Sequence, residues 1–217
     1  IRAALGSDLD FDACIDADVL PSLSVLFATG RAANAQELLA SNRFEALMHF
    51  CLREYDATII DTPPAITMAI QSVIAVAELI VVPTRPSPHD LRAVGATVDL
   101  CDRAGKPLIF VVNGATPKAK ITYEAAVALS QHGTVAPVTL HHRTDYAASM
   151  IDGRTVMEVD PKGRSAAEIE ELWRYVADRL EKNFRRTVFA APNQSPAAYQ
   201  ARTSAAAGGF GRRGVTQ

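Results

Sequence analysis

The sequence predicts an α/β fold in which a doubly wound, mostly parallel sheet is flanked by helices. Three short runs are continuously apolar: Ala57–Asp61, Leu79–Pro83 and Leu108–Asn113. Strands that are apolar throughout, rather than alternating, are typical of parallel sheets because both of their faces are buried. Segments with apolar residues at helical spacing lie between and after these runs. Strand alternating with helix indicates a doubly wound sheet.

Composition places the chain among ordinary globular proteins. It has 217 residues, of which 48% are apolar and 21% charged, and its formal net charge is −2. This is enough for one sizeable core, and it excludes collagen-like, coiled-coil and wholly disordered classes. The near-neutral charge disfavours nucleic-acid binding by bulk charge, although a local basic patch stays open. No apolar run is long enough to span a bilayer, so no membrane partner is expected.

Two further features bear on compartment and completeness. The three cysteines are widely spaced among apolar residues, which favours reduced thiols and a cytoplasmic location. The chain starts at Ile1 with neither an initiator Met nor a signal-peptide pattern, and we expect that an upstream part is missing.

The first part of the chain mixes elements. Residues 1–20 are expected to form short helical turns. A strand is expected over residues 22–29, bounded by Pro21 and Gly30. Helices are predicted over Asn34–Leu39 and Ser41–Tyr55, with Ser41 as the N-cap of the second.

The elements that follow the first apolar run are more regular. Asp145–Asp152 is predicted to be a helix closed by Gly153. The clearest helix is Ser165–Phe184, in which the spacing of Ser165 and Glu168 predicts a capping box. The other predictions are helices over Ile66–Ala77, Asp90–Ala104 and Ile121–His132 and a strand over Thr134–Leu140.

The last residues differ in kind from the rest. The segment 185–217 holds five Arg and no acidic residue and shows no periodicity, so it is predicted to be a disordered tail. The folded domain is therefore expected to span residues 1–184.

The strongest local signal for chemistry is Asp61, at the end of the first apolar run. Thr62, Pro63 and Pro64 follow it, and two prolines stop a regular backbone. A carboxylate at a strand end can hold Mg²⁺, directly or through water, next to nucleotide phosphates. The alternative is that Asp61 only caps the following helix.

The string Tyr55–Pro64 resembles the Walker B segment of the deviant-Walker ATPases, the ParA/MinD family of P-loop NTPases. The resemblance continues in order through most of the chain, from about Leu20 to Leu180. It rests on four further segments: Ala77–Leu91, Phe110–Asn113, His142–Val156 and Asp160–Ile169.

This resemblance implies a partition ATPase that uses ATP and Mg²⁺. Asp61 would be catalytic and would assist the metal, and Thr62, Pro63, Pro83 and Asn113 would contact the nucleotide. ATP binding would join two subunits, the dimer would bind DNA non-specifically, and a ParB-like partner would stimulate hydrolysis. The implied location is cytoplasmic and nucleoid-associated. The residues expected to contact DNA are Arg143, Arg154, Lys162, Lys118 and Lys120.

One departure from the family pattern concerns the phosphate loop. No G-x-x-x-x-G-K-[ST] occurs in the 217 residues. Ile15–Asp18 matches the family's I-D-x-D string by letter, but the residues before it predict the end of a helix. Either the phosphate loop and first strands precede Ile1, or the chain is a degenerate homologue. In both cases these residues alone are expected to be inactive.

Two alternatives to partitioning remain. The first third is also similar to the tyrosine autokinases of bacterial polysaccharide export, but the C-terminal segment holds a single tyrosine, Tyr199. The other alternative is a pseudo-ATPase that keeps the sheet only for protein contacts.

Overall fold

The computed structural model describes residue 5 and residues 10–27, 35–62 and 67–190. These residues form two compact units, which divide between Val76 and Ala77. No helix among them is both long and apolar enough to cross a bilayer.

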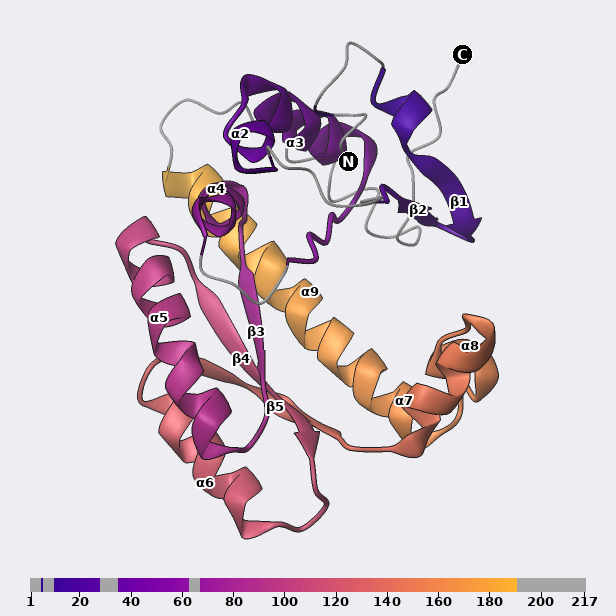
Figure 1. Cartoon of the computed structure of the whole chain (residues 1–217), viewed down its shortest axis with the longest axis vertical. Helices are drawn as coiled ribbons and strands as arrows, with labels where there is room; N and C mark the ends of the chain where they lie inside the picture. The colour runs from indigo at the N-terminus through magenta and orange to yellow at the C-terminus, as the bar shows by residue number, and fades with distance from the viewer. Residues whose placement is uncertain (1–4, 6–9, 28–34, 63–66, 191–217) are drawn as a thin grey trace. The chain divides into compact units, whose positions relative to one another are not determined.

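A parallel three-stranded sheet forms the centre of the second unit (Figure 1). Its strands are β3 (Ile80–Thr84), β4 (Leu108–Ala115) and β5 (Thr134–His141), in the order β3-β4-β5. The central strand β4 is almost entirely buried, and Phe110 is fully buried. The α/β class and the parallel sheet are confirmed, and each of these strands lies within two residues of its predicted bounds.

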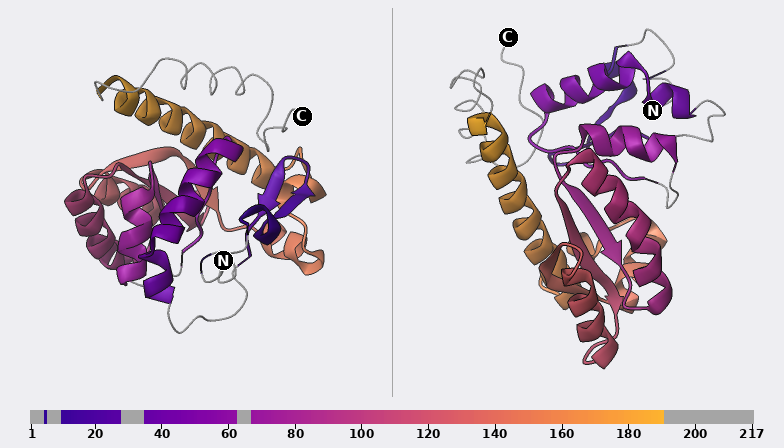
Figure 2. Two further views of the ribbon diagram at one scale, coloured as in Figure 1. Left: turned by 90° about the horizontal axis from the view of Figure 1, so that it is seen from above. Right: turned by 90° about the vertical axis from the view of Figure 1, so that its left-hand side faces the viewer.

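Helices cover the sheet on both sides (Figure 2). On one side, α5 (Pro88–Ala104) and α6 (Lys120–Ser130) pack Val94, Val98 and Leu129 against Phe110 and Val112 of β4. On the other side, α9 (Arg164–Ala190) packs along β5. These apolar faces stabilise the unit because each of the three helices buries one side against the sheet.

Local chemistry explains where α5 begins and ends. The Ser87 hydroxyl accepts a hydrogen bond from the Asp90 backbone N–H at 3.2 Å and donates one to the Asp90 carboxylate. Pro88 occupies the first turn, where its missing N–H has no cost. Gly105 ends the helix in the left-handed conformation at φ 62°. The helix thus starts before the predicted Asp90, because Ser87 provides the cap.

The strand β5 departs from regular pairing at Pro137. Its register with β4 runs from Phe110 opposite Val135 to Val112 opposite Thr139, so β5 bulges between these pairs. Proline is tolerated there because β5 is an edge strand of the sheet that the described residues form.

After β5 the chain forms α7 (Thr144–Ser149), the 3₁₀ turn η2 (Met150–Asp152) and α8 (Val156–Val159). Gly153 closes the turn at φ 81°, as predicted. A capping box that the sequence analysis missed links Thr155 and Glu158 at the start of α8.

The described residues of the first unit include a hairpin and three helices. Its strands β1 (Asp16–Leu20) and β2 (Leu23–Val25) are antiparallel and follow the 3₁₀ turn η1 (Asp12–Cys14). The buried centre of the unit includes Phe44, Leu47, Phe50, Cys51 and Val73, beside Leu5. The first five come from α3 (Asn42–Glu54) and α4 (Met68–Val76), and α2 (Ala35–Leu39) precedes them.

Two predictions in the first unit need correction. The turn η1 agrees with the helix end predicted before Ile15, but the helical turns expected over residues 1–20 do not continue, because Asp16 begins β1, whose turn uses left-handed backbone at Ser22. The strand predicted over residues 22–29 is only Leu23–Val25, and residues 28 and 29 lie outside the described part. Both errors have one cause: a short hairpin is stabilised by cross-strand pairing, which a scan for apolar runs does not register.

The predicted strand Ala57–Asp61 was also wrong. Residues 57–62 form no regular element, and the side chain of Ile59 is 82% exposed. An apolar run becomes a strand only where a neighbouring strand supplies hydrogen bonds, and no described strand pairs with this segment. The helix predictions on either side of this segment hold: Ser41–Tyr55, with Ser41 as the cap, and Ile66–Ala77, observed as Met68–Val76.

Candidate functional site at the carboxyl edge of the sheet

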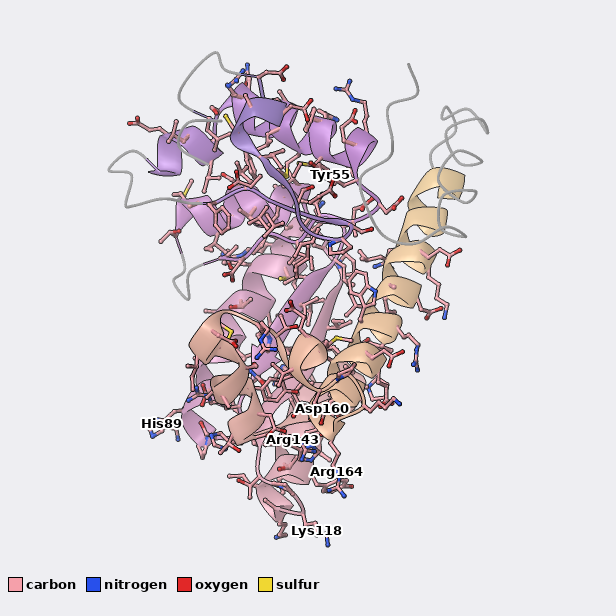
Figure 3. The ribbon with its side chains drawn as sticks, turned by 90° about the vertical axis from the view of Figure 1, so that its right-hand side faces the viewer. Tyr55, His89, Lys118, Arg143, Asp160 and Arg164 are labelled. Atoms are coloured by element: carbon pink, nitrogen blue, oxygen red, sulfur yellow. The ribbon has the colours of Figure 1, made fainter. Side chains whose placement is uncertain are left out.

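The loops that follow β3, β4 and β5 meet at one edge of the second unit because the three strands are parallel. Figure 3 shows His89, Lys118, Arg143 and Arg164 at this same end. In open α/β sheets the carboxyl edge is where ligands bind, so its side chains are the candidate site.

Two of the predicted nucleotide contacts lie on neighbouring strands near this edge. Pro83 of β3 is exposed and opposite Val111 of β4. Asn113, two residues further along β4, is half-buried. An amide at this position has both a donor and an acceptor to offer to a planar heterocycle.

A bulge shapes β4 directly after Asn113. Gly114 adopts φ +64°, and the register with β5 shifts between Asn113 and Ala115. A glycine in the left-handed region is typical of such bulges, which re-aim the side chains beside them. The position of the Asn113 amide therefore depends on the backbone of Gly114.

Arg85 lies at the same edge, and the sequence analysis did not single it out as a candidate. It follows β3, its side chain is exposed, and its Cγ lies 3.8 Å from where a Cβ on Gly114 would stand. Arg85 makes no ion pair with any residue that the structure describes. The signal that could have found it is its place: the first residue after a strand of a parallel sheet.

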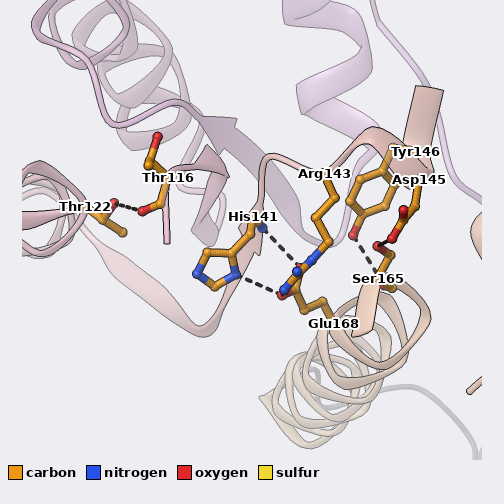
Figure 4. Close-up of polar contacts among 8 residues, drawn as sticks. All are labelled: Thr116, Thr122, His141, Arg143, Asp145, Tyr146, Ser165 and Glu168. Atoms are coloured by element: carbon orange, nitrogen blue, oxygen red, sulfur yellow. Dashed lines mark hydrogen bonds and ion pairs between the residues drawn. The ribbon is translucent and has the colours of Figure 1, made fainter. Parts of the chain in front are cut away.

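A polar cluster ties the end of β5 to α9 (Figure 4). The Glu168 carboxylate accepts hydrogen bonds from the His141 backbone N–H at 3.1 Å and from Arg143 Nη2 at 2.5 Å. It also lies 2.8 Å from His141 Nδ1. Burial opposes ionisation of this carboxyl, but the hydrogen bonds from Arg143 and His141 outweigh it and lower the pKa of Glu168.

The capping box predicted for Ser165 and Glu168 was therefore wrong. The buried Ser165 donates from Oγ to Asp145 Oδ2 at 2.9 Å, and Tyr146 Oη donates to the Ser165 carbonyl at 3.3 Å. Both capping residues point to the β5–α7 segment instead of to their own helix. Tertiary partners competed successfully for side chains whose spacing indicated a local role.

The five residues predicted to contact DNA divide into two groups. Three are neutralised by neighbours: Arg143 by Glu168, Lys120 by Glu124 at 2.9 Å and Arg154 by Asp152 at 2.7 Å. Within the described residues, Lys118 and Lys162 are exposed and have no ion-pair partner, and the same holds for Arg164.

The predicted catalytic and metal residues belong to the first unit. Asp61 and Thr62 are exposed in the irregular segment 57–62, and Pro63 lies outside the described residues. No group of three or more His, Cys, Asp or Glu side chains that could hold a metal occurs in the described ranges. A single carboxylate still fits Mg²⁺, which keeps several waters and is held by one or two carboxylates plus substrate phosphates.

Comparison with known proteins finds two relatives that carry the same name. No protein-family model matches the chain. A "Maintenance of carboxysome distribution protein A" from Halothiobacillus neapolitanus is 27% identical over 165 residues, which cover 71% of this chain and 76% of the relative. A protein of the same name from Gloeobacter kilaueensis is 27% identical over 187 residues, 79% of this chain and 81% of the relative.

A plasmid protein and a solved structure point the same way. The "Virulence plasmid ParA family protein pGP5-D" of Chlamydia psittaci is 21% identical over 168 residues, 75% of this chain and 64% of the relative. The Pyrococcus furiosus cell division ATPase MinD superposes with a TM-score of 0.61 at 16% identity, covering 83% of this chain and 74% of that one. The superposition on MinD shows that the two chains share a fold.

Proposed function

We propose that this chain is the ATPase of a partition system. Its homologues are carboxysome-distribution and ParA proteins, its fold is that of MinD, and these are ParA/MinD-type P-loop ATPases. It binds ATP and Mg²⁺, dimerises on ATP, and binds DNA non-specifically as a cytoplasmic, nucleoid-associated dimer. A ParB-like partner stimulates hydrolysis and release.

The nucleotide part of this proposal is supported by the carboxyl edge of the sheet. Pro83 and the half-buried Asn113 lie there on adjacent strands, and Asn113 would hold the adenine through its amide. Asp61 would hold Mg²⁺ directly or through water, and Thr62 and Pro63 follow it in the chain. Bound Mg²⁺ would neutralise charge that develops on the phosphates.

The DNA part is supported by the free cations of the same edge. Lys118, Lys162 and Arg164 are exposed and make no ion pair with described residues. Lysine and arginine bind DNA phosphates by releasing counterions, and a side chain already paired with a carboxylate contributes less. We therefore assign DNA contact to Lys118 and Lys162 ahead of Arg143, Arg154 and Lys120.

The single observation that carries the proposal is the presence of Pro83 and Asn113 on adjacent strands at the carboxyl edge of a MinD-like sheet. The test is light scattering of the complete chain with ATP and Mg²⁺. We expect the ATP-dependent dimer to be lost in Asp61→Ala and kept in Asp99→Ala, which removes an exposed carboxylate of α5. A dimer that survives Asp61→Ala contradicts the assignment.

The cargo has two candidates. DNA is favoured by the relative named as a plasmid ParA protein, and a protein assembly by the two relatives named for carboxysome distribution. Imaging a fluorescent plasmid and a fluorescent protein assembly in a deletion strain separates them, because the true cargo loses its even spacing.

A further inference from the structure

The segment 150–164 follows α7 and contains η2 and α8; it is called the α7–α8 lobe here. It exposes four large apolar side chains. Val156 is the apolar side chain of this segment that is buried, with 7% exposure. Isolated exposed apolar residues are normal, but several within ten residues mark an interaction surface. The four are Met150 (68% exposed), Ile151 (87%), Met157 (39%) and Val159 (48%).

The lobe is held in shape by its own polar contacts. Glu158 accepts hydrogen bonds from the Thr155 backbone N–H and hydroxyl, both at 2.9 Å. Asp152 pairs with Arg154 at 2.7 Å, and Gly153 makes the left-handed turn between them. The exposed side chains are therefore presented on an ordered scaffold, which lowers the entropy lost on binding.

The charges of the lobe balance in number but differ in availability. Asp152 and Glu158 are engaged within the lobe, whereas the Asp160 side chain is exposed. Lys162 and Arg164 are exposed and have no ion-pair partner among the described residues. The exposed charges that are left for a partner are therefore two cations, Lys162 and Arg164, against one carboxylate, Asp160.

We propose that the α7–α8 lobe docks an amphipathic segment of another protein. Apolar residues of that segment cover Met150 and Ile151, and its carboxylates bind Lys162 and Arg164. Methionine side chains suit this role because they adapt to irregular apolar partners. The inference goes beyond the proposed function: it shares Lys162 and Arg164 with the proposed DNA face, but it assigns a protein partner to the apolar side chains, and none of its residues is assigned to the nucleotide.

Charge argues against three other occupants. Residues 191–217 of the chain contain three Arg and no acidic residue, so the free cations repel them. An anionic bilayer attracts a surface at long range by the net positive charge of that surface, and the three acids and three bases of the lobe give a net charge of zero, whereas a docked carboxylate can contact the unpaired cations directly. A second copy would present the same two free cations.

The probe is a fluorescein-labelled synthetic helix of about 18 residues, with Leu and Ile on one face and Glu on the other. Fluorescence anisotropy is measured on the full chain at physiological salt without nucleotide. We expect saturable binding that weakens about tenfold in Ile151→Ser and severalfold in Lys162→Gln.

Matched controls are Val127→Ser, an apolar residue of α6 with 43% exposure, and Arg103→Gln, an exposed base at the far end of α5. Both should bind the helix as the unmodified chain does. The proposal is overturned if a helix with Lys in place of Glu binds equally well, or if Val127→Ser weakens binding as much as Ile151→Ser. Binding to phosphatidylglycerol vesicles but not to the helix, or a dimer that Ile151→Ser dissociates, also overturns it.

Discussion

Arg143, just after β5, and Glu168, in the first turns of α9, form an ion pair at 2.5 Å across 25 residues of sequence. Their side chains are 22% and 15% exposed, so the pair is largely shielded from water. His141 adds two contacts to the same carboxylate. Glu168 therefore joins the carboxyl edge of the sheet to the longest helix of the second unit.

Removing the charge of Glu168 should destabilise the protein. Glu168→Gln weakens the hydrogen bonds from three donors and leaves the Arg143 charge partly buried, at an expected loss of about 1–3 kcal/mol in the free energy of unfolding. Urea denaturation followed by circular dichroism measures it. Glu170→Gln, in an exposed pair with Arg174, should change stability by less than about 0.5 kcal/mol. Equal losses in both variants would refute the role given to Glu168.

The same carboxyl should make stability fall in acid. Its pKa lies below the ordinary value of 4.5 in the folded protein. The unfolded chain therefore takes up a proton at a higher pH than the folded one, and acid favours unfolding. The contribution is complete above about pH 5 and is lost as pH falls through the folded pKa. The difference in stability between Glu168→Gln and the unmodified chain should shrink over that window; a constant difference would contradict it.

Two glycines should respond to alanine in opposite directions. Gly153 has φ 81°, where a β-carbon is strained, so Gly153→Ala should lower stability by about 1 kcal/mol. Gly95 lies inside α5 with no atom within 4 Å of an added Cβ, so Gly95→Ala should raise stability by about 0.5–1 kcal/mol. Thermal denaturation of both variants tests the pair, and shifts of the same sign would disagree with the backbone described.

Core packing of the sheet should depend strongly on Phe110. The ring is fully buried in β4 among residues of α5 and α6. Phe110→Ala leaves a cavity and should lower the free energy of unfolding by about 3–5 kcal/mol. Phe110→Leu, which keeps most of the volume, should lose much less in the same urea titration. A small effect of the alanine variant would place the core elsewhere.

Binding of the DNA phosphates should follow the free cations. Lys118→Gln with Lys162→Gln should weaken binding to a 30-base-pair duplex and reduce the slope of log K against log salt by about two. The paired Arg154→Gln should change the slope less, because Asp152 already neutralises that side chain. Filter binding at several salt concentrations measures both. If the slope is the same for all variants, Lys118 and Lys162 do not contact DNA.

Local patterns were sufficient for most of the second unit. The apolar runs at Leu79–Pro83 and Leu108–Asn113 became β3 and β4 because a neighbouring strand lies beside each of them. Ser87 and Gly153 acted as cap and stop because their roles depend on a few adjacent residues. Ala57–Asp61 has the same apolar character, but no described strand pairs with it, and it is irregular.

Helix starts, strand runs and the likeness to ParA proteins could be read from the order of residues, because each depends on neighbours a few positions away. Which side chains pair with one another across the fold could not be read from the order of residues. Glu168 has the spacing of a capping residue, yet it binds His141 and Arg143, and two of the other four basic residues predicted to contact DNA are also neutralised. Such choices depend on which side chains packing brings within hydrogen-bond distance, a property of three-dimensional contacts that no local pattern contains.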